Sequence, residues 1–329
     1  MVFNITSTVP EIVSKKNLDP EIDAFLKKEK LTLGGKEPFL DERRHHTEVL
    51  ANVPLSSEQK SVKLIPHIVP GPVGDINVRQ YIPSGYGGTA LPVLVYIHGG
   101  GWTVGSLPEF DGWFRLAAYY GKIQVISLEY RLAPEWRYPV QLNEIKATLE
   151  WVYANASTLG VIPSKIALGG DSCGGNMTAV TAQRTLKDPD FKVPIALQCL
   201  FYAECKIPFE VPSGSENFNA PYIPTQGVFL FAWHVVPAGK NHVDWDITPL
   251  NGENLSKLPP AFFVTCGYDP LRDTGLYYAQ KLQKEGVPVE YLHNEDLTHG
   301  FLQFTPWSKR ALETTIQVAE HIGKKLREE

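Results

Sequence analysis

The sequence predicts an α/β protein with a mostly parallel central sheet flanked by helices. Apolar runs typical of strands buried on both faces occur at 91–97, 123–128, 165–168, 195–202, 261–265 and 287–292. Helical patterns lie between or after them, at 139–154, 174–186, 271–285 and 306–327. Strands that alternate with helices form βαβ units, which build a parallel sheet with helices on both faces. Two alternating runs in front, 62–69 and 76–82, predict an antiparallel hairpin at one edge.

Composition and charge exclude several classes of function. The chain has 329 residues, of which 43% are hydrophobic, and this suits one large catalytic domain with a small cap. A net charge of −5 argues against nucleic acid as a partner, and the one basic cluster, 43–46, is expected to be a solvated surface segment. The four cysteines form no CxxC pair, and no secretion signal or membrane-spanning run is recognised. We therefore expect a cytoplasmic protein without a membrane span.

Two segments interrupt the regular alternation and predict a helical cap. Asp19 and Pro20 are typical of a helix start, and the helix over 19–31 has one apolar stripe that must cover something. The insertion 206–258 is rich in proline and aromatic residues and is too long for a plain connection. We predict a cap made from the N-terminal arm 1–55 and the insertion 206–258, over a catalytic domain formed by 56–205 and 259–329.

The segment 170–174, Gly-Asp-Ser-Cys-Gly, lies between a predicted strand and a predicted helix. This is the context of a nucleophile turn, in which small residues permit a sharp bend that lifts the serine hydroxyl out of the sheet. The helix that follows offers free N–H groups to an anion. Ser172 is therefore the candidate nucleophile, against the alternative of a glycine-rich turn with an idle serine.

The segment 98–102, His-Gly-Gly-Gly-Trp, directly follows the predicted strand 91–97. Three glycines without Cβ atoms let backbone N–H groups approach a substrate oxygen. A phosphate-binding loop is excluded because no Gly-Lys-Ser/Thr follows. Together with the serine turn, this segment predicts an oxyanion hole.

An acid and a histidine should follow the serine in the chain, each at the end of a strand. Asp269 follows the strand 261–265 and His299 follows the strand 287–292, so we predict that they complete a catalytic triad. Asp273 is the alternative acid, one helical turn further on. The alternative histidines, which have no comparable position, are His234, His242 and His293.

These motifs together resemble the hormone-sensitive lipase family of esterases. The matching segments are HGGGW at 98–102, YRLAPE at 130–135, GDSCGGN at 170–176, DPLRD at 269–273 and HGF at 299–301. The resemblance implies the α/β-hydrolase fold and hydrolysis of small-molecule carboxylic esters with short or medium acyl chains, without cofactor or metal. It also implies that the N–H groups of Gly100, Gly101 and Cys173 form the oxyanion hole, and that His98 and the YRLAPE segment support the glycine loop.

The resemblance leaves several points open. The family usually has alanine where this chain has Cys173, so we expect thiol reagents to inhibit by blocking the space behind the nucleophile. Related gibberellin receptors lack the catalytic histidine, whereas His299 is present here. Amide hydrolysis by the same triad stays an alternative to ester hydrolysis. Since edge-strand dimers occur in the family, the chain is expected to be a monomer or a homodimer.

Aromatic residues are the candidates for the substrate pocket. We expect Trp102, Phe229 and Trp233 to line it, because aromatic side chains supply apolar walls for small ligands. The alternative is that the aromatic residues of the insertion, Phe231 among them, only attach the cap to the domain.

Overall fold

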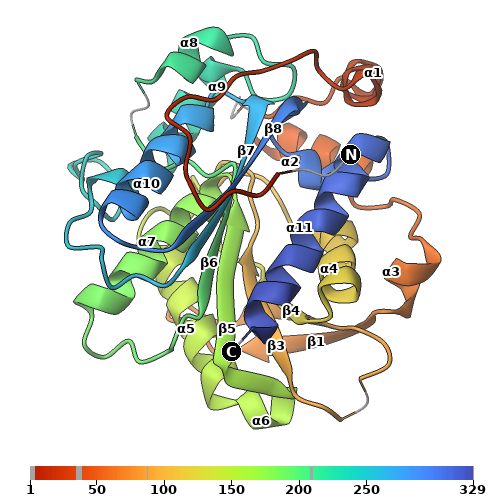
Figure 1. The fold of residues 1–329 in the computed structure, drawn as a ribbon, viewed down its shortest axis with the longest axis vertical. Coiled ribbons are helices and arrows are strands. Elements are labelled where there is room, and N and C mark those ends of the chain that lie inside the picture. Colours follow the sequence, from red (N-terminus) through yellow and green to blue (C-terminus); the bar gives the residue numbers. More distant parts are fainter. Residues whose placement is uncertain (1–3, 35–38, 87, 208–209, 329) are drawn as a thin grey trace.

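The computed structural model describes residues 4–34, 39–86, 88–207 and 210–328, built around one sheet of eight strands (Figure 1). The strands are β1 (Lys63–Val69), β2 (Ile76–Ile82), β3 (Leu91–Ile97), β4 (Gln124–Leu128), β5 (Val161–Asp171), β6 (Leu197–Phe201), β7 (Ala261–Tyr268) and β8 (Val289–Thr298). Their order is β1-β2-β4-β3-β5-β6-β7-β8. β1 and β2 pair antiparallel at one edge, and all pairs from β4 to β8 are parallel. The predicted α/β architecture and edge hairpin are confirmed.

Helices cover both faces of this sheet (Figure 1). One layer holds α4 (Leu107–Gly121) and α11 (Lys309–Arg327), which pack against each other; the other holds α5 (Val140–Ala154), α7 (Cys173–Lys187) and α10 (Arg272–Lys284), with the short α6 (Ala156–Leu159) beyond α5. Of these helices, neither the short α6 nor the longer α4 was predicted. The side chains of α4 are buried on several sides, Phe110, Trp113 and Phe114 among them, so its sequence lacks a single apolar stripe.

Two strands extend further toward the candidate site in the structure than the sequence predicted. β5 extends to Asp171, immediately before the serine, and β8 extends to Thr298, immediately before the histidine. The end of β8 was missed because its sequence from 293 to 298 is mostly polar. This part still pairs with β7, and its other edge is met by the N-terminal arm.

The N-terminal arm runs along the exposed edge of β8. Thr6 and Tyr291 exchange two backbone hydrogen bonds, of 3.0 and 2.9 Å, and the Lys16 N–H donates to the Glu295 carbonyl at 3.0 Å. Helix α1 (Pro20–Glu29) then begins as predicted, since Asp19 accepts from the Ile22 N–H at 2.9 Å. The arm thereby covers the sheet edge that would otherwise offer unpaired backbone groups.

The arm and the insertion meet at the end of the molecule where the parallel strands terminate (Figure 1). The arm continues as α2 (Phe39–Leu50) and α3 (Ser57–Ser61), and the insertion contains α8 (Pro212–Glu216), α9 (Thr225–Val235) and the 3₁₀ turn η1 (Pro249–Asn251). The Leu33 N–H donates to the Tyr222 carbonyl at 2.8 Å, which joins the two segments. Residues 1–3, 35–38 and 208–209 of these segments lie outside the described part.

Among the described helices, none combines the length and apolar composition that a bilayer span requires.

Glu204, which follows β6, is a buried acid. Its side chain is 3% exposed, and burial raises the pKa of its carboxyl to about 8. This acid is therefore mostly protonated in the folded protein at neutral pH.

The contact between α4 and α11 predicts that one helix glycine is required and another is not. A Cβ at Gly323 would lie 1.8 Å from the Gly121 carbonyl oxygen, whereas a Cβ at Gly112 would lie 3.5 Å from its nearest neighbour, Gln59. Gly323→Ala should lower the free energy of unfolding by roughly 1–3 kcal/mol through overpacking. Gly112→Ala, the matched control, should be neutral or stabilising. Urea unfolding measures both, and equal effects would contradict this account.

The buried acid predicts a pH-dependent contribution to stability. Between about pH 4.5 and pH 8 the folded state retains a proton on Glu204 that the unfolded chain has lost, so stability falls as pH rises through this window. Glu204→Gln has no proton to lose. Its unfolding free energy relative to the wild type should therefore rise between pH 5 and pH 8, by on the order of a few kcal/mol.

Chemical denaturation at the two pH values tests this expectation. The exposed Glu48 of α2 provides a control, since Glu48→Gln should shift stability by similar amounts at both. A Glu204→Gln effect that does not change with pH would show that the buried carboxyl is not the source.

Candidate active site

Ser172 stands at a sharp turn between β5 and α7. Its backbone has φ 55° and ψ −122°, a conformation that L-residues rarely adopt and that costs about 1–3 kcal/mol. The two glycines of the motif permit the turn, because a Cβ at Gly170 or Gly174 would lie 2.6 or 2.1 Å from the carbonyl oxygen of Ile97. The turn therefore packs directly on the end of β3 and presents the serine side chain beyond the sheet.

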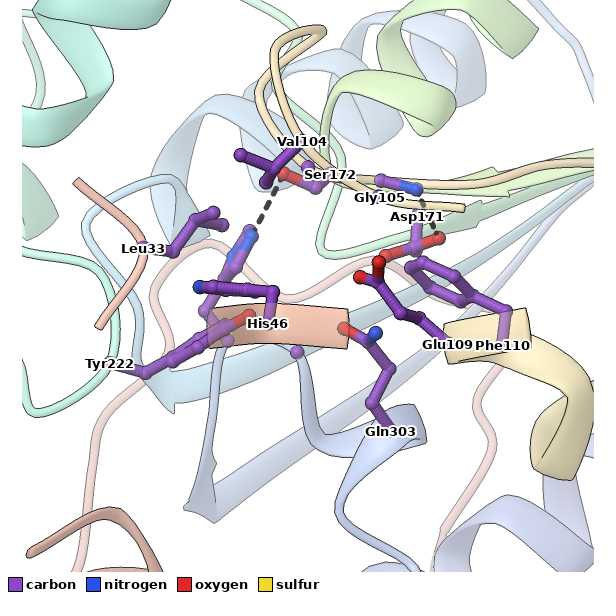
Figure 2. A pocket seen from close by; sticks show the side chains of 14 residues that line it. Leu33, His46, Val104, Gly105, Glu109, Phe110, Asp171, Ser172, Tyr222 and Gln303 are labelled. Carbon is purple, nitrogen blue, oxygen red and sulfur yellow. Dashed lines mark hydrogen bonds between the residues drawn. The ribbon is translucent and has the colours of Figure 1, made fainter. Parts of the chain in front are cut away.

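His299 lies between Ser172 and Asp269. Its Nε2 is 2.9 Å from the serine Oγ, drawn as a dashed line in Figure 2, and its Nδ1 is 2.9 Å from Oδ2 of Asp269. The three side chains are at most 4% exposed. Because a carboxylate only accepts, the Nδ1–H donates to Asp269, and the lone pair of Nε2 is left to accept the serine proton. The other oxygen of Asp269 accepts from the Leu271 N–H at 2.8 Å, which fixes the carboxylate.

The alternative acid and histidines have other contacts. Asp273 accepts from the Ser213 N–H and from Arg272, each at 2.8 Å. His293 contacts the Ser14 carbonyl and Thr265 on β7. His234 packs edge-on against the ring of Phe39 in α2, and His242 lines a cavity of the cap.

The glycine loop is joined to the serine turn by Asp171. One oxygen of this carboxyl accepts from the Gly99 N–H at 2.8 Å and from the Tyr96 hydroxyl at 2.9 Å. Sequence reasoning assigned no role to Asp171, although it occupies the variable position before the serine. Burial raises its pKa to about 6, so it is mostly ionised at neutral pH and acts as the acceptor in both bonds.

Three backbone N–H groups close to Ser172 in the chain or in the glycine loop have no acceptor among the described residues: those of Gly100, Gly101 and Cys173. Gly100 has φ 117° and Gly101 has φ 57°, and a Cβ at Gly100 would lie 2.1 Å from the Val104 carbonyl oxygen. Cys173 is the first residue of α7, where the helix dipole is positive. Such an arrangement of donors can bind an anionic oxygen.

Residues outside the loop hold it in place. The Tyr130 hydroxyl donates to the His98 carbonyl at 2.9 Å, and the Ala133 N–H donates to the Trp102 carbonyl at 2.8 Å. Arg43 of the arm donates to the carbonyls of Thr103 and Ala133, at 2.6 and 2.8 Å. The expectation that 43–46 is a solvated segment is thus wrong for Arg43, which donates to carbonyls beside this loop, and for His46, which is 2% exposed, whereas Arg44 is exposed.

The Cys173 side chain points away from solvent. Its Sγ accepts from the Trp102 N–H at 3.2 Å, and the side chain is fully buried. Burial raises the pKa of the thiol to about 12, so the reactive thiolate does not form at neutral pH. The structure therefore contradicts the expectation that thiol reagents attack this residue, and assigns the sulfur to support of the glycine loop.

Two cavities of different character lie near the serine. The first is lined by Ser172, His299 and polar residues of α2 and α4, and leaves only about 10 Å³ for the centre of a water-sized group (Figure 2). The second is a mainly apolar cavity of about 420 Å³ in the cap, lined by Glu204, Ile207, Val228, Phe229, Ala232, Trp233 and His242.

The aromatic residues that were predicted to line the substrate pocket lie in different places. Phe229 and Trp233 line the large cavity and are 47% and 72% exposed, whereas Phe231 is buried against Gly101 and attaches the cap. Trp102 is 4% exposed and lines a third, small cavity with Met177.

In the described part of the chain, no cluster of three or more His, Cys, Asp or Glu side chains is suited to hold a metal ion.

Comparison with known proteins adds to this geometry. Residues 94–303 match the family described as alpha/beta hydrolase fold. Carboxylesterase NlhH of Mycobacterium tuberculosis is 40% identical over 248 residues, which cover 73% of this chain and 76% of that one. Arylacetamide deacetylase of Bos taurus is 33% identical over 291 residues, covering 70% and 73%.

Solved structures agree with these relatives. A bacterial heroin esterase superimposes with a TM-score of 0.85 at 28% identity, covering 95% of this chain and 99% of that one. The esterase of the archaeon Pyrobaculum calidifontis gives 0.83 at 29% identity, covering 94% and 99%. The chain therefore belongs to the α/β-hydrolase family and, within it, to the hormone-sensitive lipase family of carboxylesterases.

Proposed function

We propose that this chain hydrolyses short- to medium-chain carboxylic esters through an acyl-enzyme on Ser172. The observation that carries the proposal is the position of His299, 2.9 Å from the serine Oγ and 2.9 Å from Asp269. A histidine held in this way can take the hydroxyl proton while the carboxylate stabilises the resulting imidazolium.

In the proposed acylation step, Ser172 Oγ attacks the ester carbonyl carbon as its proton passes to Nε2 of His299. The carbonyl oxygen becomes an oxyanion and receives hydrogen bonds from Gly100, Gly101 and Cys173, each such donor typically lowering the barrier by about 3 kcal/mol. The imidazolium then protonates the leaving alcohol, and an acyl ester remains on the serine.

Deacylation repeats these steps with water as the nucleophile. His299 takes a proton from the water as its oxygen attacks the acyl carbonyl, and the second oxyanion occupies the same donors. Collapse of this intermediate releases the acid, and the proton on His299 returns to Ser172. The enzyme is then ready for another ester, and no step requires a metal or cofactor.

The acyl chain is proposed to occupy the cap cavity of about 420 Å³. Its exposed aromatics, Phe229 and Trp233, supply apolar surface, and Glu204 connects it to the serine because its N–H donates to the Ser172 carbonyl at 3.2 Å. A volume of this order accepts chains of several carbons. Trp102 keeps a proposed indirect role, since it ends the glycine loop and its N–H donates to Cys173 Sγ.

Amide hydrolysis is the second candidate, and the similarity to an arylacetamide deacetylase favours it. The proposed triad and oxyanion hole serve amide and ester leaving groups alike. Rates on p-nitrophenyl butyrate and its matched p-nitroanilide would distinguish the two, and a faster anilide would make amides the primary substrates.

The remaining proposals concern the state of the protein. We propose that the cap consists of residues 1–55 and 206–258. We also propose that the protein is a monomer or a homodimer. A dimer would use a surface other than the β8 edge, because the arm occupies that edge. Four buried, unpaired cysteines support a reducing, cytoplasmic location.

The triad predicts large losses of turnover without loss of fold. Ser172→Ala and Asp269→Asn should each lower kcat on p-nitrophenyl butyrate by roughly 10⁴-fold or more, because the first removes the nucleophile and the second favours the wrong histidine tautomer. Asp273→Asn is the matched control, since that acid does not contact His299. Turnover and thermal unfolding are measured on all three. Near-normal activity of Ser172→Ala would refute the proposal.

The cap cavity predicts a change in chain-length preference. Trp233→Ala should lower kcat/KM for p-nitrophenyl octanoate relative to the acetate by about 3- to 10-fold, because apolar contact with the distal methylenes is lost. Phe218, which is 57% exposed and outside the described lining of the cavity, provides the control Phe218→Ala. A uniform loss across all chain lengths would show that Trp233 does not contact the acyl chain.

A further inference from the structure

We propose that Glu109 makes this site selective for esters that carry a hydrogen-bond donor, a hydroxyl or an ammonium group, a few atoms from the scissile bond. The inference rests on the proposed ester hydrolysis at Ser172 and concerns which esters are preferred. The proposed mechanism makes no use of the Glu109 carboxyl, so this side chain is available for recognition.

Glu109 lies in the first turn of α4 and is 5% exposed. Its Oε1 accepts two hydrogen bonds of 2.8 Å, from the hydroxyls of Thr47 in α2 and Ser106 before α4. Its Oε2 is equally buried and has no hydrogen-bond partner among the described residues. A buried acceptor left unsatisfied is costly, so the free oxygen marks a place where a donor is expected.

The carboxyl of Glu109 shares a cavity with the reacting groups. The small cavity of about 10 Å³ is lined by Glu109 together with Ser172 and His299. Figure 2 shows the side chains of Glu109, Gln303 and His46 gathered on one side of this cavity, below the serine. Its volume admits one group the size of a water molecule, which matches a hydroxyl or a primary ammonium but not a longer substituent.

The cavity favours a donor over an acceptor. His46 Nε2 lies 3.0 Å from the Thr32 carbonyl and must donate to it, so Nδ1 is left as an acceptor. Burial lowers the pKa of His46 to about 4, which keeps the ring neutral. The lining contains no lysine or arginine within the described chain. A substrate carbonyl or ether oxygen placed against Glu109 Oε2 or His46 Nδ1 would therefore face an acceptor, whereas a hydroxyl or ammonium in that position would be bound.

The charge of Glu109 responds to such a ligand. Burial raises the pKa of its carboxyl to about 7, with a further contribution from the nearby Glu129. A donor on Oε2 favours the ionised form, and an ammonium also supplies the opposite charge that the cavity lacks. The two donor classes can thus be distinguished by how strongly each depends on the carboxylate charge.

The test uses esters of equal length that differ by one terminal group. On the acyl side these are methyl butyrate, methyl 3-hydroxypropionate and methyl 3-aminopropionate; on the alcohol side they are propyl acetate and 2-hydroxyethyl acetate. The readout is the ratio of kcat/KM for the donor-bearing ester to that for its apolar partner, measured at pH 8. Intrinsic reactivity cancels when the wild-type ratio is divided by that of a variant.

Two variants separate charge from hydrogen bonding. Glu109→Leu should lower the donor ratio about tenfold or more in at least one series, and the series affected identifies the side of the ester that enters the cavity. Glu109→Gln retains an acceptor oxygen, so it should lose the ammonium preference and keep much of the hydroxyl preference. Glu48→Gln is the control: this acid is exposed on α2 and lies outside the described lining, so its ratios should equal those of the wild type.

Ratios that are the same in the wild type and in both Glu109 variants, for both series, would overturn the inference. Continued hydrolysis of methyl butyrate, abolished by Ser172→Ala, would then leave the proposed function intact. Failure of the wild type to hydrolyse any of the esters would instead refute the proposed function. Thermal unfolding verifies each variant, and if Glu109→Leu does not fold, the ammonium ratio of Glu109→Gln decides alone.

Discussion

The close approach of the serine turn to the end of β3 is the contact on which the site depends. A side chain at Gly174 would place its Cβ 2.1 Å from the Ile97 carbonyl oxygen, so only glycine allows the two segments to meet. This approach brings the carboxyl of Asp171 within 2.8 Å of the Gly99 N–H. The nucleophile turn and the glycine loop are therefore one rigid unit, and a displacement of either would move both the hydroxyl and the N–H groups proposed to receive the oxyanion.

The rest of the site is organised around that unit at a cost in stability. The strained backbone of Ser172 and the buried acids Asp171, Glu204 and Glu109 all oppose folding, since burial raises the pKa of each carboxyl. Asp171 offsets part of this cost through two hydrogen bonds that join the loop to the turn. A preorganised site of this kind holds its polar groups in fixed positions away from water. The folded protein is less stable as a result, because water would otherwise solvate these groups.

The sequence predicts the parts of this arrangement that are local. Ser172, Asp269 and His299 were identified because each follows a recognisable strand, and parallel strands end at one edge of a sheet. What could not be predicted depends on tertiary contacts. The basic segment 43–46 has the composition of a surface, yet Arg43 donates to the carbonyls of Thr103 and Ala133 beside the glycine loop. Similarly, the end of β8 is polar in sequence and is a strand only because β7 and the N-terminal arm pair with it.

The groups proposed to react and the groups proposed to select the substrate come from different parts of the chain. The reacting groups stand on strand ends of the sheet, whereas the arm contributes Thr47 and His46 near the small polar cavity and the insertion contributes Trp233 to the large apolar one. Tyr222 of the insertion also lines the small cavity, so the proposed selection for acyl-chain size and for a neighbouring polar group shares one cap segment but uses different side chains. The Leu33–Tyr222 hydrogen bond holds the two cap segments together above one unchanged set of reacting atoms. Substitutions in a cap assembled from two distant stretches of sequence would therefore change the proposed specificity while the side chains proposed to react stay in place on the sheet.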